Sequence, residues 1–135
     1  MDERVLQFVR DTAHTMVGLD VALFYQANPS TFDTPTGIAL RTHRGVDEIK
    51  PALERLAKHG VLEVHERAEG RYTCYALVRD QGIWTTLCRV SDAYHGNPEV
   101  RKQILMILVQ QQRSARKAKQ DAEQPKNAGS EKNNA

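Results

Sequence analysis

The chain has 135 residues, a length that one domain accounts for, with a modest core and no room for a large enclosed active site. Its net charge is +2 and its pI about 8.6, a balance that permits nucleic-acid binding without requiring it. The longest apolar run, residues 104–109, is too short to span a membrane, and the two cysteines form no CxxC pair. With no secretory signal at its start, the sequence predicts a cytoplasmic protein with reduced thiols and no membrane association.

The N-terminal third predicts two helices. Apolar residues at helical spacing between charged ones indicate an amphipathic helix over residues 2–16, with Asp2 as its N-cap. Gly18 is expected to interrupt this helix, so residues 1–17 are assigned to an N-terminal helix outside the central domain. A second helix is predicted over residues 19–27, and Asn28-Pro29 ends it because a residue before proline avoids the helical region.

The second helix carries an aromatic pair, and the pattern lets either Phe24 or Tyr25 face inward. Thr34-Pro35 is typical of an N-cap followed by the first helical residue, and predicts a short helix over residues 34–40. Residues 41–45 are then expected to turn the chain into a longer helix.

That longer helix is predicted over residues 45–60. Its apolar stripe consists of Ile49, Leu53 and Leu56 at positions i, i+4 and i+7. Gly60 suits the left-handed conformation that commonly follows a helix end. Pro51 has no N–H to donate, and we expect it to kink or loosen the first half of the helix.

The hydrophobic pattern then changes from a helical to a strand period. Residues 61–64 and 71–77 predict two short strands, and Ala68-Glu69-Gly70 predicts the turn between them. This stretch is therefore expected to form a two-stranded hairpin directly after the long helix.

Two C-terminal helices are predicted over residues 79–117, capped by Asp80 and by Asn97-Pro98. The centre of the last helix is apolar on every face, which favours a second packing partner in addition to the chain's own core. We therefore expect a homodimer whose contact is centred on Ile104, Ile107 and Leu108. The polar composition of residues 118–135 predicts a disordered tail.

The run Ile49-x-x-x-Leu53-x-x-Leu56-x-x-x-Gly60-Val61-Leu62, preceded by the short Thr34-Pro35 helix, resembles a winged helix-turn-helix domain. The resemblance is closest to MarR-like and PadR-like bacterial transcriptional regulators and covers roughly residues 19–78, so residues 18–78 are assigned to a winged-helix domain. It implies an α+β fold, mostly α, with additional N- and C-terminal helices that build a homodimer. It also implies a transcriptional regulator that binds double-stranded DNA.

In that family the long helix enters the major groove and the hairpin touches the DNA backbone or minor groove. Carried over by position, the resemblance implies DNA contacts from the outer face of the long helix, from its entrance and from the hairpin tip. The matching residues are Thr36, Arg44, Lys50, Pro51, Glu54, Lys58, Arg67 and Arg71. Lys50 is the residue expected to reach base edges.

Other functions remain open at this stage. The outer face of the long helix carries Asp47 and Glu54 beside Lys50 and Lys58, a near-neutral balance that also suits a winged-helix adaptor binding protein instead of DNA. No catalytic motif, metal-ligand spacing or phosphate-binding glycine loop is present in the sequence, so we expect neither an enzyme nor a metal or cofactor.

Two further clusters allow two interpretations each. The four basic residues within 113–119 either bind DNA phosphates or form an ordinary solvated helix end. Trp84, Tyr94 and Tyr25 either line a ligand pocket or belong to the core.

Overall fold

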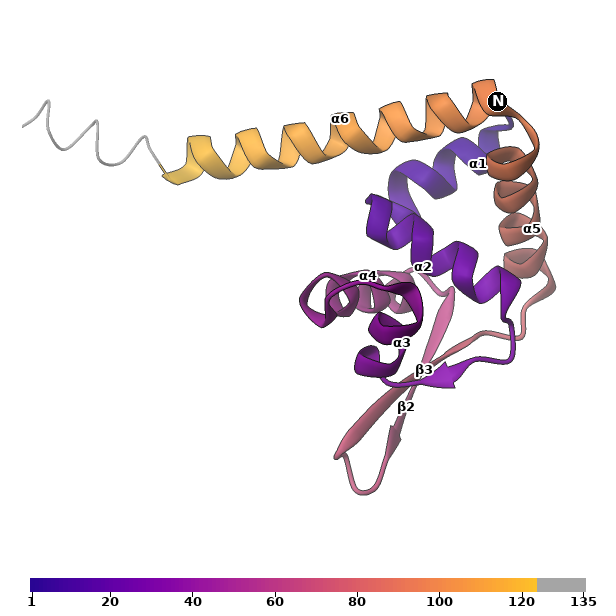
Figure 1. The fold of residues 1–135 in the computed structure, drawn as a ribbon, viewed down its shortest axis with the longest axis vertical. Coiled ribbons are helices and arrows are strands. Elements are labelled where there is room, and N and C mark those ends of the chain that lie inside the picture. The colour runs from indigo at the N-terminus through magenta and orange to yellow at the C-terminus, as the bar shows by residue number, and fades with distance from the viewer. Residues whose placement is uncertain (124–135) are drawn as a thin grey trace, which may run out of the picture.

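The structure is a computed structural model that describes residues 1–123 (Figure 1). Within them the chain is α+β and mostly helical, with six α-helices and a small three-stranded antiparallel sheet. The greater part of the tail predicted to be disordered, residues 124–135, lies outside the described residues. No helix within residues 1–123 combines the length and apolar character needed to cross a membrane.

The N-terminal helix is divided differently from the prediction. Helix α1 (Glu3–Gln7), capped by Asp2 as expected, continues as a π-helical segment, η1 (Phe8–Ala13). The chain breaks at His14, whose φ is 66°, and Thr15 caps helix α2 (Met16–Ala27) by accepting a hydrogen bond from the Gly18 amide. The expected interruption at Gly18 is therefore wrong, because Gly18 lies inside the first turn of α2.

Gly18 has a packing role in place of the expected helix-breaking one. A Cβ at this position would lie 2.1 Å from the backbone oxygen of Ala13, closer than any real side chain could be. The absence of a side chain thus lets the end of η1 approach the first turn of α2.

The central helices follow the predicted order. Helix α3 (Pro35–Thr42), capped by Thr34, and helix α4 (Val46–Lys58) are joined by a three-residue turn. Helix α4 runs through Pro51 without a break, and Gly60 after it has a φ of 79°, as its role at the helix end requires. In the structure α2 packs against α4, and α3 packs against α4.

The predicted hairpin is confirmed as strands β2 (Leu62–Arg67) and β3 (Tyr72–Leu77). A third strand, β1 (Phe32–Asp33), was not predicted; it pairs with β3 and gives the sheet the order β1-β3-β2. Two residues are too few to show a strand period, so only the pairing with a segment far along the chain defines β1.

The core settles which aromatic residue of α2 faces inward. Tyr25 is fully buried and its hydroxyl donates a 2.8 Å hydrogen bond to the backbone oxygen of Tyr75 in β3, whereas Phe24 is only half-buried. Burial raises the pKa of the Tyr25 hydroxyl well above its ordinary value, and the nearby charge of Asp33 raises it further. The largest fully buried side chains are Tyr25, Leu19, Ile38, Ile49, Leu53, Leu56, Leu87, Ile104 and Leu108.

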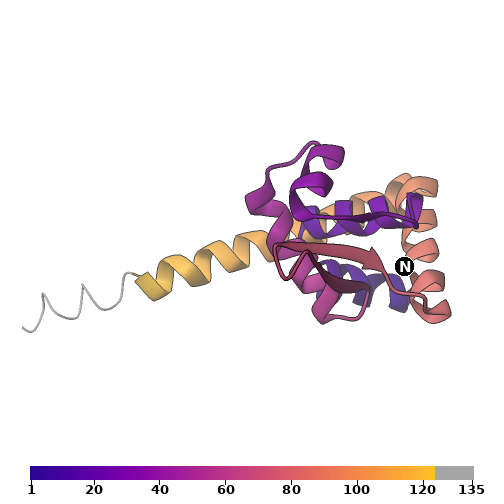
Figure 2. The ribbon, with the colours of Figure 1, turned by 90° about the horizontal axis from the view of Figure 1, so that it is seen from below.

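Two C-terminal helices complete the fold. Helix α5 (Gln81–Gly96) is capped by Asp80, whose carboxylate accepts a hydrogen bond from the Ile83 amide. The helix packs on α2, and its Trp84 and Tyr94 pack against the core. Helix α6 (Pro98–Glu123) crosses over η1 and α5 and projects beyond the body of the molecule in both views (Figures 1 and 2). Residues 118–123 are helical, so the predicted start of the tail at residue 118 is wrong.

The inner face of α6 belongs to the chain's own core. Ile104 and Leu108 are buried within the single chain, and Ile107 is partly buried against the same cluster. The sequence assigns Ile104 and Leu108 to a contact between two copies, whereas the structure uses both side chains in the core of one chain; the homodimer itself stays a prediction. The exposed large apolar residues of α6 are Met106 and Val109, 62% and 41% exposed.

Candidate nucleic-acid interface

The outer face of α4 is arranged as the sequence predicts. Lys50, Pro51, Glu54 and Lys58 are all exposed, on the side of α4 opposite its buried stripe. Asp47 is exposed on the same face, so the two lysines are matched by two carboxylates. This surface offers donors and acceptors without a net charge.

Thr36, which the resemblance places near the entrance of the long helix, is exposed in the first turn of α3, at the end away from the turn that leads into α4. The backbone amide of Thr34 donates to the Asp33 carboxylate at 2.7 Å, and the amide of Gly37 donates to the Thr34 hydroxyl at 3.2 Å. The Asp33 carboxylate also fills the space where a side chain at position 37 would lie. The positive end of the α3 dipole thus already has its own anion, which disfavours a phosphate there.

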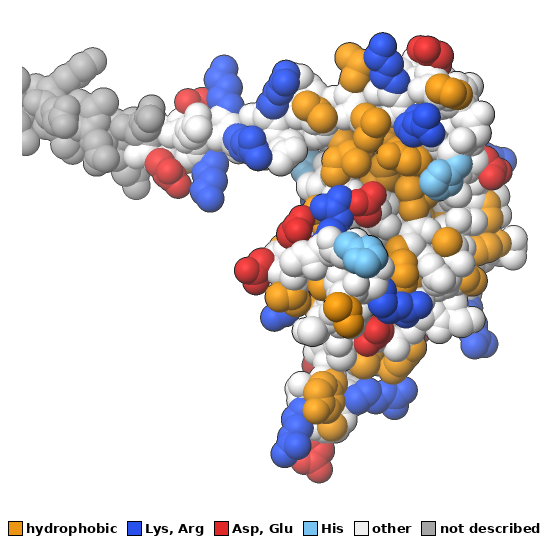
Figure 3. All heavy atoms as spheres, in the orientation of Figure 1, with side chains coloured by type: hydrophobic (Ala, Val, Ile, Leu, Met, Phe, Trp, Pro, Cys, Tyr) orange, Lys and Arg blue, Asp and Glu red, His pale blue; other side chains and the backbone are white. Residues whose placement is uncertain are grey.

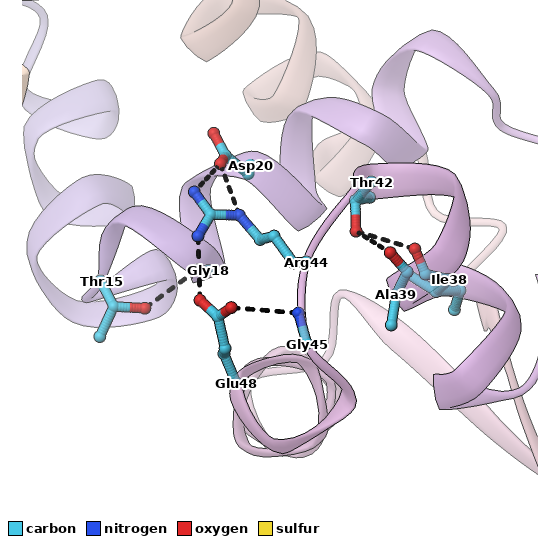
Figure 4. Close-up of polar contacts among 9 residues, drawn as sticks. All are labelled: Thr15, Gly18, Asp20, Ile38, Ala39, Thr42, Arg44, Gly45 and Glu48. Atoms are coloured by element: carbon cyan, nitrogen blue, oxygen red, sulfur yellow. Dashed lines mark hydrogen bonds and ion pairs between the residues drawn. The ribbon is translucent and has the colours of Figure 1, made fainter.

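Arg44 lies at the entrance to α4, where the sequence predicts it, but its guanidinium group is bound within the chain (Figure 4). Its Nε donates to the Asp20 carboxylate of α2 at 2.9 Å, and its Nη1 donates to Glu48 at 3.1 Å. The other Glu48 oxygen accepts from the Gly45 amide at 3.1 Å. The hydrogen bonds to Asp20 raise the pKa of Arg44.

This network gives Arg44 a positioning role. It joins the middle of α2 to the first turn of α4 through one side chain. The i, i+4 spacing of Arg44 and Glu48 was visible in the sequence, whereas the contact with Asp20 depends on how α2 packs.

The hairpin places its two arginines on either side of the turn. Arg67 ends β2 and Arg71 precedes β3, and both are exposed. The Arg67 guanidinium lies over the ring of Phe32 in β1, 5.2 Å from its centroid, and the His65 ring lies 5.3 Å from the same centroid. These contacts, which the sequence did not predict, attach the hairpin to β1 and orient Arg67.

A second stacked arginine was also missed. Arg41 of α3 is exposed, and its guanidinium lies 4.9 Å from the ring centroid of Phe24. Arg41 and Phe32 line the same shallow hollow of about 360 Å³ beside residues 28–31. No sequence signal links Arg41 to Phe24, because the two lie on different helices.

A larger hollow of about 510 Å³ lies at the inner end of the α4 face. It is bounded by α4, by the junction of η1 with α2, and by Gln112 of α6. On its α4 side, Arg55 donates two hydrogen bonds to the backbone oxygen of Asp11, at 2.6 and 3.2 Å. The hollow is lined by Ala13, His14, Thr15, Met16, Val17, Glu48, Pro51, Ala52, Arg55 and Gln112.

The predicted site residues therefore fall into separate groups. Lys50, Pro51, Glu54 and Lys58 form one surface, whereas Arg67 and Arg71 lie on a hairpin that points away from the helices (Figure 1). Arg44 is bound between α2 and α4 and belongs to neither group.

Within residues 1–123, no three His, Cys, Asp or Glu side chains gather as the ligands of a metal ion would. Cys74 is buried and Cys88 half-buried, and both are free thiols. Comparisons with family models, with curated proteins and with solved structures find no match for this chain.

Proposed function

We propose that the chain is a winged-helix protein that binds double-stranded DNA and controls transcription. The observation that carries the proposal is the order of elements from α2 to β3. A helix, a short strand, two helices joined by a tight turn and a hairpin follow one another, and the hairpin pairs with the short strand. This order supports the resemblance to a winged helix-turn-helix domain, with α4 as the helix presented to DNA.

In this proposal α4 enters the major groove, which is wide enough for a helix. Lys50 reaches base edges, and Lys58 neutralises a phosphate at the other end of the same face. Arg67 and Arg71 contact the backbone from the hairpin. Arg44 acts indirectly, because its bonds to Asp20 and Glu48 fix the start of α4.

The protein acts as a homodimer in this account, with two copies of α4 presented to half-sites about 34 Å apart. The contact between copies lies on the outer face of α6, where Met106 and Val109 are exposed. A shallow apolar hollow of about 420 Å³ lies beside them, lined by Met1, Leu6, Gln103, Met106 and Ile107.

The neutral α4 face favours a second candidate, a winged-helix adaptor that binds another protein. A surface with as many carboxylates as lysines repels phosphates at two positions and attracts them at two. Retention on DNA at low salt separates the two candidates, because only the DNA-binding protein is retained.

The test measures anisotropy of a labelled random-sequence duplex with the full chain. The DNA-binding account predicts affinity that falls steeply between about 50 and about 200 mM salt. A sequence selected from the random duplexes for tight binding then tests base contact. Lys50→Ala should weaken binding to this sequence by about 1 kcal/mol or more, whereas Lys102→Ala on α6 should leave the preference for it over random sequence unchanged. No binding at about 50 mM salt would favour the adaptor.

The dimer has its own test, the mass of the full chain in solution. A dimeric mass is expected, and Met106→Glu should shift it to that of a monomer without unfolding the chain. A monomeric wild type would contradict the proposed contact.

A further inference from the structure

Helix α6 extends well past the body to which it is attached. Its first half is held by the buried Ile104 and Leu108, and by Gln111, whose Nε2 donates to the backbone oxygen of Arg10 at 2.9 Å. Every side chain from residue 112 to residue 123 is exposed. At 1.5 Å per residue this segment, the α6 extension, is about 18 Å long. Figures 1 and 2 show it projecting from the body.

The extension is basic along most of its length. It carries Arg113, Arg116, Lys117 and Lys119 with no acidic residue between them, and Asp121 and Glu123 follow at its far end. None of these four side chains takes part in an ion pair within residues 1–123. Figure 3 shows the Lys and Arg side chains standing out along the projecting helix.

The extension has little to offer a partner that binds by apolar contact. Its only apolar side chains are alanines, at positions 115, 118 and 122. A second copy packed extension against extension in parallel would bring the same four cations together, and in either orientation the apolar part of the contact would be alanine methyl groups alone. Charge is therefore the property by which this segment recognises a partner, and a polyanion fits it.

The extension begins next to α4. Gln112, its first residue, lines the same hollow as Pro51 and Arg55 of α4. Figure 1 shows the extension leaving the body on the side where α4 lies. One long ligand can therefore contact both the α4 face and the extension.

The α4 face and the α6 extension differ in charge, and this difference suggests which of them supplies affinity and which supplies specificity. The α4 face is neutral, whereas residues 113–119 carry four positive charges. Neutralised phosphates supply most of the sequence-independent affinity for DNA, and base contacts supply specificity.

We propose that the α6 extension is a phosphate-binding arm that holds the backbone of double-stranded DNA while α4 contacts the bases. This inference rests on the proposed function and assigns most of the affinity to a segment outside residues 18–78. Of the two interpretations that the sequence allows for the four basic residues of α6, it selects binding to DNA phosphates over an ordinary solvated helix end.

The experiment compares the wild type with R113Q/R116Q/K117Q/K119Q, using the labelled random-sequence duplex over a series of salt concentrations. Each lost phosphate contact makes the negative slope of log K against log salt shallower by about 0.9, so the magnitude of the slope should fall by about 3.6. R116Q/K117Q alone should lower it by about 1.8. Circular dichroism and thermal unfolding of each variant establish that α6 and the core are intact.

The matched control is R101Q/K102Q, which removes two positive charges from the anchored end of the same helix. Its slope should equal that of the wild type. If R101Q/K102Q and R116Q/K117Q reduce the magnitude of the salt slope equally, binding follows net charge and the arm is overturned.

The remaining outcomes separate the arm from the proposed function. A quadruple variant that keeps the wild-type slope would overturn the arm and leave DNA binding in place. A wild type that binds no duplex at about 50 mM salt would overturn both. A quadruple variant that loses affinity for a single-stranded oligonucleotide but keeps its affinity for the duplex would also overturn the arm as proposed.

Discussion

Arg44 and Asp20 form an ion pair that fixes the first turn of α4 against the middle of α2 (Figure 4). The same guanidinium group donates to Glu48, whose other oxygen accepts from the Gly45 amide. One arginine thus sets the start of the helix that we propose to contact DNA. Its side chain is 25% exposed and that of Asp20 is 36% exposed.

Because both partners are partly solvated, we expect Asp20→Asn to lower the free energy of unfolding by less than about 1 kcal/mol. A double-mutant cycle of Asp20→Asn and Arg44→Gln, measured by urea denaturation, gives the coupling between them. The coupling should shrink as salt is added, since exposed charges are screened. A coupling of zero at low salt would show that the pair does not hold α4.

The buried Tyr25 predicts a loss of stability at high pH. Its pKa is raised in the folded state by burial, so the folded chain keeps a proton that the unfolded chain loses above pH of about 10. Stability should therefore fall as pH rises through that value, by up to about 1.4 kcal/mol per pH unit for this group.

Tyr25→Phe isolates this effect. At neutral pH it removes the hydrogen bond to Tyr75 and should cost about 1 kcal/mol. Between about pH 9 and 11 its stability should fall less steeply than that of the wild type, by urea denaturation at each pH. Some slope should remain, because burial also raises the pKa of Tyr75. Parallel curves for the two proteins would contradict this account of Tyr25.

Gly18 predicts a severe packing defect. In Gly18→Ala the new Cβ would meet the backbone oxygen of Ala13, so η1 and α2 must separate, at a cost of about 1–3 kcal/mol. Gly96→Ala is the matched control at the end of α5, where nothing lies within 4 Å. The control should be neutral or slightly stabilising in thermal unfolding. Similar unfolding temperatures for both variants would show that Gly18 does not lie close to the backbone oxygen of Ala13.

Neighbouring residues of α6 distinguish the core from the surface. Leu108→Ala should lower the free energy of unfolding by about 2–5 kcal/mol, because it leaves a cavity between α6 and η1. Val109→Ala, at an exposed position, should change it by no more than about 0.5 kcal/mol. Denaturant unfolding at low protein concentration makes the comparison, and equal losses would mean that α6 is packed differently.

Local signals predicted much of the fold. The apolar stripe of α4, the change to strand spacing after Gly60, and the caps at Thr34, Asp80 and Asn97 all lie within a few residues of what they define. The exposure of Lys50 and its neighbours followed from the same helical period.

Features that depend on distant contacts were not predictable in this way. Strand β1 exists only through its pairing with β3, and Arg44 finds Asp20 only once α2 has packed. The apolar centre of α6 could not reveal whether Ile104 and Leu108 face the chain's own core or a second copy. The π-helical turn and the break at His14 lack the proline or glycine that usually marks such a change.

The most direct test of DNA binding by α4 is an amide NMR titration of the full chain with a short duplex. The account predicts shifts concentrated on residues 50–58 and 67–71, with further shifts along 113–119 from the proposed arm. The amides at the buried centre of α5 are the control and should not shift. Shifts confined to other surfaces, or none at low salt, would contradict the claim that α4 is presented to DNA.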